Sequence, residues 1–268
     1  LSAMLFRFSA NLSLAEVWDW RLVAAYLWAT TFVYGIATIV GLVRGQSMEV
    51  TAFEAQCAVI GNTGFLGVPM LTLLLGPEAI GPVVLALAID LIVFSSLIVI
   101  VVTISREGRM QFGVLKTVGL GLLKNPMIVA MSAGFVWSSV GLPLPTALDD
   151  FLVLLGAAAT PGALFAIGAS LAGKSAERIE VAGWLTFAKL VLHPLAVAGA
   201  CIYVFKVAPF ASAVLIATAS LPVAGNIYIL AQHYGVAPTR VSAAILVSTA
   251  VSIVTVSLVI AWVSAGLL

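Results

Sequence analysis

Three ionisable residues lie in the middle of long apolar stretches of the sequence: Asp90, Lys189 and His193. An ionised side chain is costly in apolar surroundings unless it is paired or serves a function. Lys189 could attract an anionic substrate, His193 could relay a proton near neutral pH, and Asp90 could carry a proton. Lys189 and His193 are spaced i, i+4, so on a helix they share one face. The alternatives are a structural ion pair of Asp90 with Lys189 and a buried, hydrogen-bonded His193.

Two amide side chains interrupt other apolar stretches, in GNTGFLGVP (61–69) and LPVAGNIYILAQHYG (221–235). An asparagine amide can donate to a carboxylate oxygen and can also accept from a protonated group. We therefore predict that Asn62 and Asn226 contact a substrate, with Thr63 and Tyr228 as second-rank contacts. The alternative is that the two asparagines only cap broken helix ends.

Glycine and proline accompany both amides. Gly61, Gly64 and Gly225 allow close approach of the backbone, although small residues also simply pack membrane helices together. Pro69 and Pro222 lack the N–H that would bond to an i−4 carbonyl, so they keep a helix broken. These five residues are predicted to form the scaffold of the site.

The elements that carry these residues are membrane helices. Hydrophobic residues make up 62% of the 268-residue chain and charged residues only 9%, far from the composition of a soluble domain. A net charge of +1 gives no basic footprint for nucleic acid. No phosphate loop, HExxH motif or nucleophile elbow is present, so we expect no cofactor, no metal site and no enzyme. Cys57 and Cys201 are expected to be small core residues.

Apolar stretches of roughly 20 residues predict eight full transmembrane spans after a partial opening helix at 1–10. The spans are 21–43, 52–75, 79–105, 118–141, 148–172, 181–206, 208–232 and 239–267. The amphipathic segment 105–125 is expected to lie along the membrane surface. We expect that one helix and part of another precede Leu1.

Lysine and arginine near the span ends predict the orientation. One set of alternate connections carries eight basic residues, and the other carries only Arg21 and Lys206. The eight are Arg44, Arg106, Arg109, Lys116, Lys124, Lys174, Arg178 and Arg240. This side is predicted to be cytoplasmic, in a bacterial inner membrane, with the C-terminus outside. Arg7 is either a site residue or a side chain that reaches toward the membrane surface.

The two Gly–Asn pairs belong to an internal repeat. AMLFRFSA (3–10) resembles GALFAIGA (162–169), and LIVFSSLIVI (91–100) resembles VSIVTVSLVI (251–260), at nearly the same offset as the Gly–Asn pairs. Equivalent spans are separated by an odd number of crossings, which inverts their topology. The predicted organisation is an incomplete first repeat (1–105), a cytoplasmic connection (106–124) and a second, inverted repeat (125–268).

Four segments together resemble the auxin efflux carrier family, the bacterial permeases related to plant PIN carriers. They are GNTGFLGVPML (61–71), NPMIVAMSAG (125–134), FAKLVLHPL (187–195) and LPVAGNIYILAQHYGV (221–236). The resemblance implies an all-α fold of ten helices, two inverted five-helix repeats and two crossed discontinuous helices. It also implies a scaffold and a transport domain that move relative to each other, a homodimer, and a carboxylate substrate such as malonate.

The predicted function is a secondary transporter that moves a small organic anion by alternating access. The alternative is a sodium- or proton-coupled carrier of a related ten-helix fold with a different substrate. Such carriers usually have acidic residues beside the crossing, and Asp90 is the only acidic residue that we place clearly at membrane depth. A membrane enzyme lacks supporting motifs, and a channel would not need paired broken helices.

Overall fold

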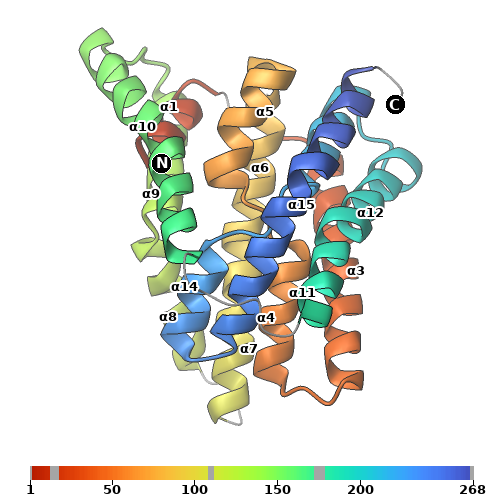
Figure 1. The fold of residues 1–268 in the computed structure, drawn as a ribbon. Coiled ribbons are helices and arrows are strands. Elements are labelled where there is room, and N and C mark those ends of the chain that lie inside the picture. Colours follow the sequence, from red (N-terminus) through yellow and green to blue (C-terminus); the bar gives the residue numbers. More distant parts are fainter. Residues whose placement is uncertain (1, 13–17, 108–111, 172–178, 266–268) are drawn as a thin grey trace.

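The computed structural model describes residues 2–12, 18–107, 112–171 and 179–265, and these are helical apart from short connections (Figure 1). In chain order the elements are α1 (Ser2–Ala10), α3 (Trp20–Val43), α4 (Met48–Val59), η1 (Thr63–Gly67), α5 (Val68–Leu75), η2 (Pro77–Ala79), α6 (Ile80–Ile89), η3 (Asp90–Phe94), α7 (Ser95–Glu107), α8 (Phe112–Lys124), α9 (Pro126–Val140), α10 (Thr146–Leu171), α11 (Ile179–Phe187), η4 (Ala188–Leu192), α12 (His193–Gly199), η5 (Ala200–Val204), α13 (Pro209–Ala219), α14 (Asn226–Tyr234) and α15 (Pro238–Ser264). The prediction of an all-α polytopic membrane protein is confirmed.

Four continuous helical segments of the described chain are long and apolar enough to cross a membrane: Trp20–Val43, Pro77–Arg106, Ile179–Val204 and Pro238–Ser264. The predicted spans 52–75 and 208–232 are instead each divided into two shorter helices, α4 with α5 and α13 with α14. The breaks fall at the two Gly–Asn pairs, as their sequences predict.

The predicted span 118–141 is not one straight helix. Val118–Lys124 and Pro126–Val140 meet at an angle of 71°. Pro126 disfavours helical backbone at Asn125, and the side chain of Asn125 caps the new helix by accepting from the N–H of Met127 at 2.9 Å. The proline of the NPM sequence therefore starts α9 rather than lying inside a longer helix.

The helices form two groups, which Figure 1 shows side by side. The peripheral group consists of α1, α9 and α10, with α1 packed against the other two. A Cβ at Gly134 would lie 2.5 Å from the carbonyl oxygen of Phe6, so α1 and α9 approach as closely as glycine allows. The core group consists of α3 to α7 and α11 to α15, and it holds the main hydrophobic cluster.

Glu54, on α4, is a buried acidic residue that the sequence analysis missed, since it considered only Asp90 to be at membrane depth. The Glu54 side chain is 2% exposed and is held by two arginines. Arg44 contacts it at 2.9 Å and Arg240 at 2.8 Å. Three of the basic residues used for orientation, Arg109, Lys174 and Arg178, lie outside the described residues.

Candidate functional site

The two broken helices meet where each is interrupted. Gly61 and Val223 form an antiparallel bridge between the two breaks. The N–H of Asn62 donates to the carbonyl of Pro222 at 2.8 Å, and the N–H of Ala224 donates to the carbonyl of Ile60 at 3.1 Å. Backbone groups freed by a helix break cost several kcal/mol in hydrocarbon when they are unpaired, and here the breaks satisfy each other.

Two helix beginnings and two helix ends converge at this crossing. α4 and α13 end there, while η1 and α14 begin there at Thr63 and Asn226. The beginnings present free N–H groups with partial positive charge, and the ends present carbonyls with partial negative charge. The crossing therefore combines partial positive charge from the helix beginnings with partial negative charge from the helix ends.

A small cavity of about 30 Å³ lies at the crossing. It takes side chains from both breaks, from the α6–η3 segment and from α9 of the peripheral group. Its lining consists of Ile60, Gly61, Asn62, Gly64, Phe65, Leu87, Asp90, Leu91, Ser95, Met127, Ala224, Gly225 and Asn226. The structure thus brings both predicted asparagines, three of the predicted scaffold glycines and Asp90 to one cavity.

The two amides are available for a ligand. Asn62 precedes η1 but makes no side-chain capping hydrogen bond within the described chain, although it is only 7% exposed. The side-chain oxygen of Asn226 is buried and has no hydrogen-bond partner among the described residues. Buried polar atoms in proteins are nearly always bonded, so an unpaired amide oxygen in a cavity marks a position for a ligand or a water molecule.

The other sequence candidates lie around the cavity rather than in its lining. Thr63 is buried and donates to the carbonyl of Gly61 at 3.5 Å, and the hydroxyl of Tyr228 accepts from Gln232 at 2.8 Å. Pro222 supplies the carbonyl that pairs with Asn62. Pro69 lies in the first turn of α5, where a missing N–H costs little.

Asp90 begins the π-helical turn η3, and its carboxylate accepts a hydrogen bond from Tyr26 on α3. The Tyr26 hydroxyl lies 3.1 Å from one carboxylate oxygen and 3.3 Å from the other. Both side chains are almost completely buried. Because Asp90 lines the cavity, Tyr26 positions the only acidic group among the lining residues.

Lys189 lies behind the crossing, in the π-helical turn η4. Its ammonium donates to the carbonyl of Ala219, the last residue of α13, and lies 3.2 Å from Nδ1 of His193. A Cβ at Gly61 would lie 3.4 Å from the same nitrogen. The positive charge of Lys189 therefore stands at the negative end of α13 and beside the first break.

The direct ion pair of Asp90 with Lys189, considered from the sequence, is not formed among the described residues. Asp90 binds Tyr26, whereas Lys189 binds Ala219 and His193. His193 also lies 3.1 Å, through Nε2, from the hydroxyl of Thr30. An ammonium can only donate, so a charged Lys189 places the proton of a neutral His193 on Nε2, where it can donate to Thr30.

Sequence reasoning missed Tyr26, Thr30 and Ser248. Ser248, on α15, accepts from the N–H of Val223 in the second break at 3.1 Å. These residues are ordinary hydroxyl side chains on apolar helices, and nothing in their local sequence distinguishes them. A signal does exist for two of the π-helical turns, since η3 contains Asp90 and η4 contains Lys189, and such turns are frequent at functional sites.

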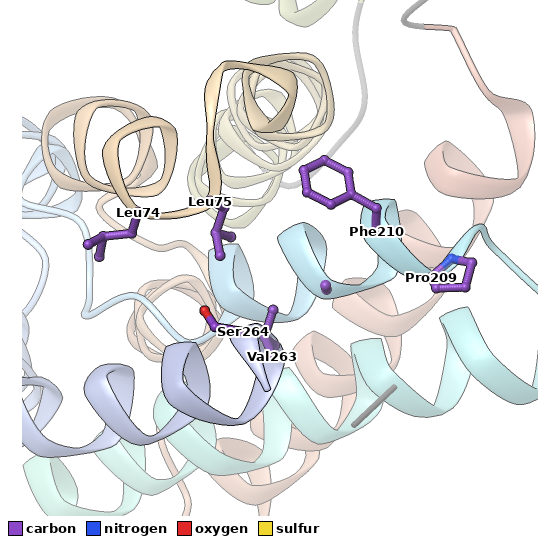
Figure 2. A pocket seen from close by; sticks show the side chains of 7 residues that line it. Leu74, Leu75, Pro209, Phe210, Val263 and Ser264 are labelled. Carbon is purple, nitrogen blue, oxygen red and sulfur yellow. The ribbon is translucent and has the colours of Figure 1, made fainter. Parts of the chain in front are cut away.

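A larger pocket of about 370 Å³ lies elsewhere, where the ends of α5 and α15 meet the beginning of α13 (Figure 2). Its lining is apolar apart from Ser264 and carries no charged side chain. Nothing in it recognises an anion.

Within the described residues, no group of three histidine, cysteine or acidic side chains is arranged to hold a metal ion.

The whole chain resembles transport proteins. Its sequence matches the family described as "Membrane transport protein" over residues 2–260. The chain belongs to this family. It is also 27% identical over 263 residues to the "Putative malonate transporter" of Rhizobium meliloti (strain 1021), across 96% of this chain and 81% of that protein. The resemblance inferred from the four sequence segments is confirmed, and the chain is a multi-pass membrane transport protein.

Proposed function

We propose that this chain is a secondary transporter for a small organic anion, which binds at the crossing of the two broken helices. The observation that carries the proposal is the convergence of Asn62 and Asn226 on one cavity, where, among the described residues, Asn62 makes no capping hydrogen bond and the Asn226 side-chain oxygen has no partner. Amide nitrogens can donate to a carboxylate, and amide oxygens can accept from a protonated acid. The cation of Lys189 directly behind Gly61 favours negative charge at this place.

The size of the cavity supports alternating access. A volume of about 30 Å³ holds roughly one water molecule, whereas ligand pockets usually exceed about 300 Å³. The site must therefore widen to admit a carboxylate. Met127 of the peripheral group lines the cavity opposite residues of the core group, so movement of one group against the other would open it.

Asp90 gives a reason for proton coupling. An ionised Asp90 and a substrate anion in the same small cavity would repel each other strongly, because the surroundings have a low dielectric constant. We infer that Asp90 is protonated when the anion is bound and releases its proton after the anion leaves. Lys189 at the end of α13 meanwhile fills the position that a coupling cation would need, which argues against sodium.

For the substrate we infer a dicarboxylate of the size of malonate, from the name of the Rhizobium relative. From the distribution of basic residues we infer that the C-terminus lies outside, and from the resemblance to bacterial permeases we infer an inner-membrane protein. Assembly as a homodimer remains a prediction from the family resemblance.

The test of the site is uptake of radiolabelled malonate into proteoliposomes that contain the full-length protein. We expect Asn62→Ala and Asn226→Ala to reduce uptake by about 10-fold or more, since each removes charge-assisted hydrogen bonds to the carboxylate. The exposed Asn11 provides the matched control, and Asn11→Ala should transport like the wild type. Wild-type uptake by both crossing variants would refute the site.

The same vesicles test the coupling. A proton gradient should drive uptake by the wild type, and a sodium gradient should not. Asp90→Asn keeps an oxygen that can accept from Tyr26 but cannot take up a proton at this site. It should abolish uptake driven by the proton gradient while exchange of labelled for unlabelled malonate continues. Sodium-driven uptake by the wild type would refute the proposed coupling.

A further inference from the structure

A pocket of about 350 Å³ separates the peripheral group from the outer half of the first broken helix. Its walls come from α1 and α10 on one side and from Pro69 of α5 on the other. The volume lies in the range of small-molecule sites, in contrast to the cavity at the crossing. Unlike the apolar pocket of Figure 2, this pocket contains a charged side chain, that of Arg7.

Arg7 already shows which chemical group it binds. Its guanidinium donates to both carboxylate oxygens of Asp149, at 2.6 and 3.0 Å. Two parallel hydrogen bonds of this kind match a planar carboxylate. The Arg7 and Asp149 side chains are 32% and 30% exposed, so water screens the pair and a carboxylate from solution can compete with Asp149.

The pocket lies next to the crossing. Gly64 and Phe65 of η1 line the cavity at the crossing, while Pro69, one turn farther along the same segment, lines the pocket of Arg7. α10 also touches η1 directly. A single short segment therefore separates the two spaces, and a shift of that segment against the peripheral group would connect them.

We propose that the pocket of Arg7 is an access site, in which a small carboxylate replaces Asp149 on the Arg7 guanidinium before it moves to the crossing. The remaining walls are apolar and include Phe8, Leu152 and Val153, so the pocket takes one carboxylate and leaves any second charge facing the open mouth. This inference rests on the proposed transport of an organic anion. It assigns a separate binding step to residues outside the crossing.

The two members of the pair give opposite expectations. Asp149→Asn removes the competing carboxylate and should lower the malonate concentration for half-maximal uptake about two- to fivefold, the range expected from an exposed ion pair. Arg7→Gln removes the guanidinium and should raise that concentration about 10-fold or more. Asp150→Asn is the matched control, because Asp150 adjoins Asp149 without taking part in this ion pair, and it should behave like the wild type.

A purely structural ion pair would make both variants worse in the same direction, and that outcome would overturn the proposal. Unchanged half-saturation in both variants would overturn it equally. If Arg7→Gln fails to fold, Asp149→Asn still decides the question, since only an access site predicts tighter binding. Failure of the proposed function itself looks different. In that case the wild type would take up no malonate, and Asn62→Ala would change nothing.

Discussion

The break after α4 is completed by atoms of the two broken segments themselves, whereas the break after α13 also depends on side chains from other helices. In the first break, the carbonyl of Ile60 and the N–H of Asn62 bond to the backbone of the second, and the Thr63 hydroxyl of the same segment donates to the carbonyl of Gly61. In the second break, Lys189 binds the carbonyl of Ala219, and Ser248 binds the N–H of Val223. The two breaks have similar Gly–Asn sequences, but their unpaired groups are satisfied in different ways.

This difference separates a half of the site that is held by contacts between the two breaks from a half that other helices also control. Close packing fixes the first break, since a Cβ at Gly67 would lie 2.5 Å from Cδ1 of Leu221. The second break depends on Lys189, which His193 links to Thr30 on α3. A change in the charge or position of Lys189 would therefore alter the second break first. Substitutions can test this asymmetry.

The largest effect is expected from Lys189→Met. The change leaves the carbonyl of Ala219 without its donor and removes the cation behind Gly61. An unsatisfied buried polar group costs about 1–3 kcal/mol, and we expect a lower melting temperature together with loss of malonate uptake. The control is Lys116→Met, which removes an exposed lysine from α8. Normal stability and uptake in Lys189→Met would show that the second break does not need its side-chain support.

How much of the site can be predicted from the sequence depends on whether the interaction leaves a visible pattern of residues. Gly61, Asn62, Gly225 and Asn226 could be assigned to one site because a repeat of unusual residues in apolar segments is visible without coordinates. The bridge of Gly61 with Val223 fits this assignment, because two helix breaks at similar depth can pair their free backbone N–H and C=O groups with each other. Membrane helices themselves follow from composition alone.

The partners of the charged residues could not be predicted in this way. Opposite charges in similar apolar surroundings favour an ion pair of Asp90 with Lys189, but in the fold Asp90 accepts from Tyr26 and Lys189 donates to the last carbonyl of α13. Glu54 was missed although Arg44 lies only 10 residues before it, because its second arginine partner, Arg240, comes from a distant part of the chain. Contacts between distant segments need the three-dimensional arrangement of the helices.

An intermediate effect is expected from Gly67→Ala in the first break. The new methyl group would meet the Leu221 side chain, and overpacking of this kind costs about 1–3 kcal/mol. In the double variant with Leu221→Ala, the loss of melting temperature should be smaller than the sum of the two single losses, because the new methyl group fills part of the space that the Leu221 side chain leaves. Gly199→Ala is the control, because a Cβ there meets nothing within 4 Å. Additive losses in the double variant would contradict the close contact between the two breaks.

The smallest effect is expected from Ser248→Ala, which removes one neutral hydrogen bond from the second break. The N–H of Val223 loses its partner, and a bond of this kind contributes about 1 kcal/mol. Ser257→Ala on the same helix is the control, because that hydroxyl bonds only to the carbonyl of Ile253 in its own helix. If the second break is the controlled half, Ser248→Ala should slow uptake more than Ser257→Ala at equal protein amounts. Equal uptake rates would leave Lys189 as the side chain on which the asymmetry depends, and would reduce Ser248 to a contributor to stability.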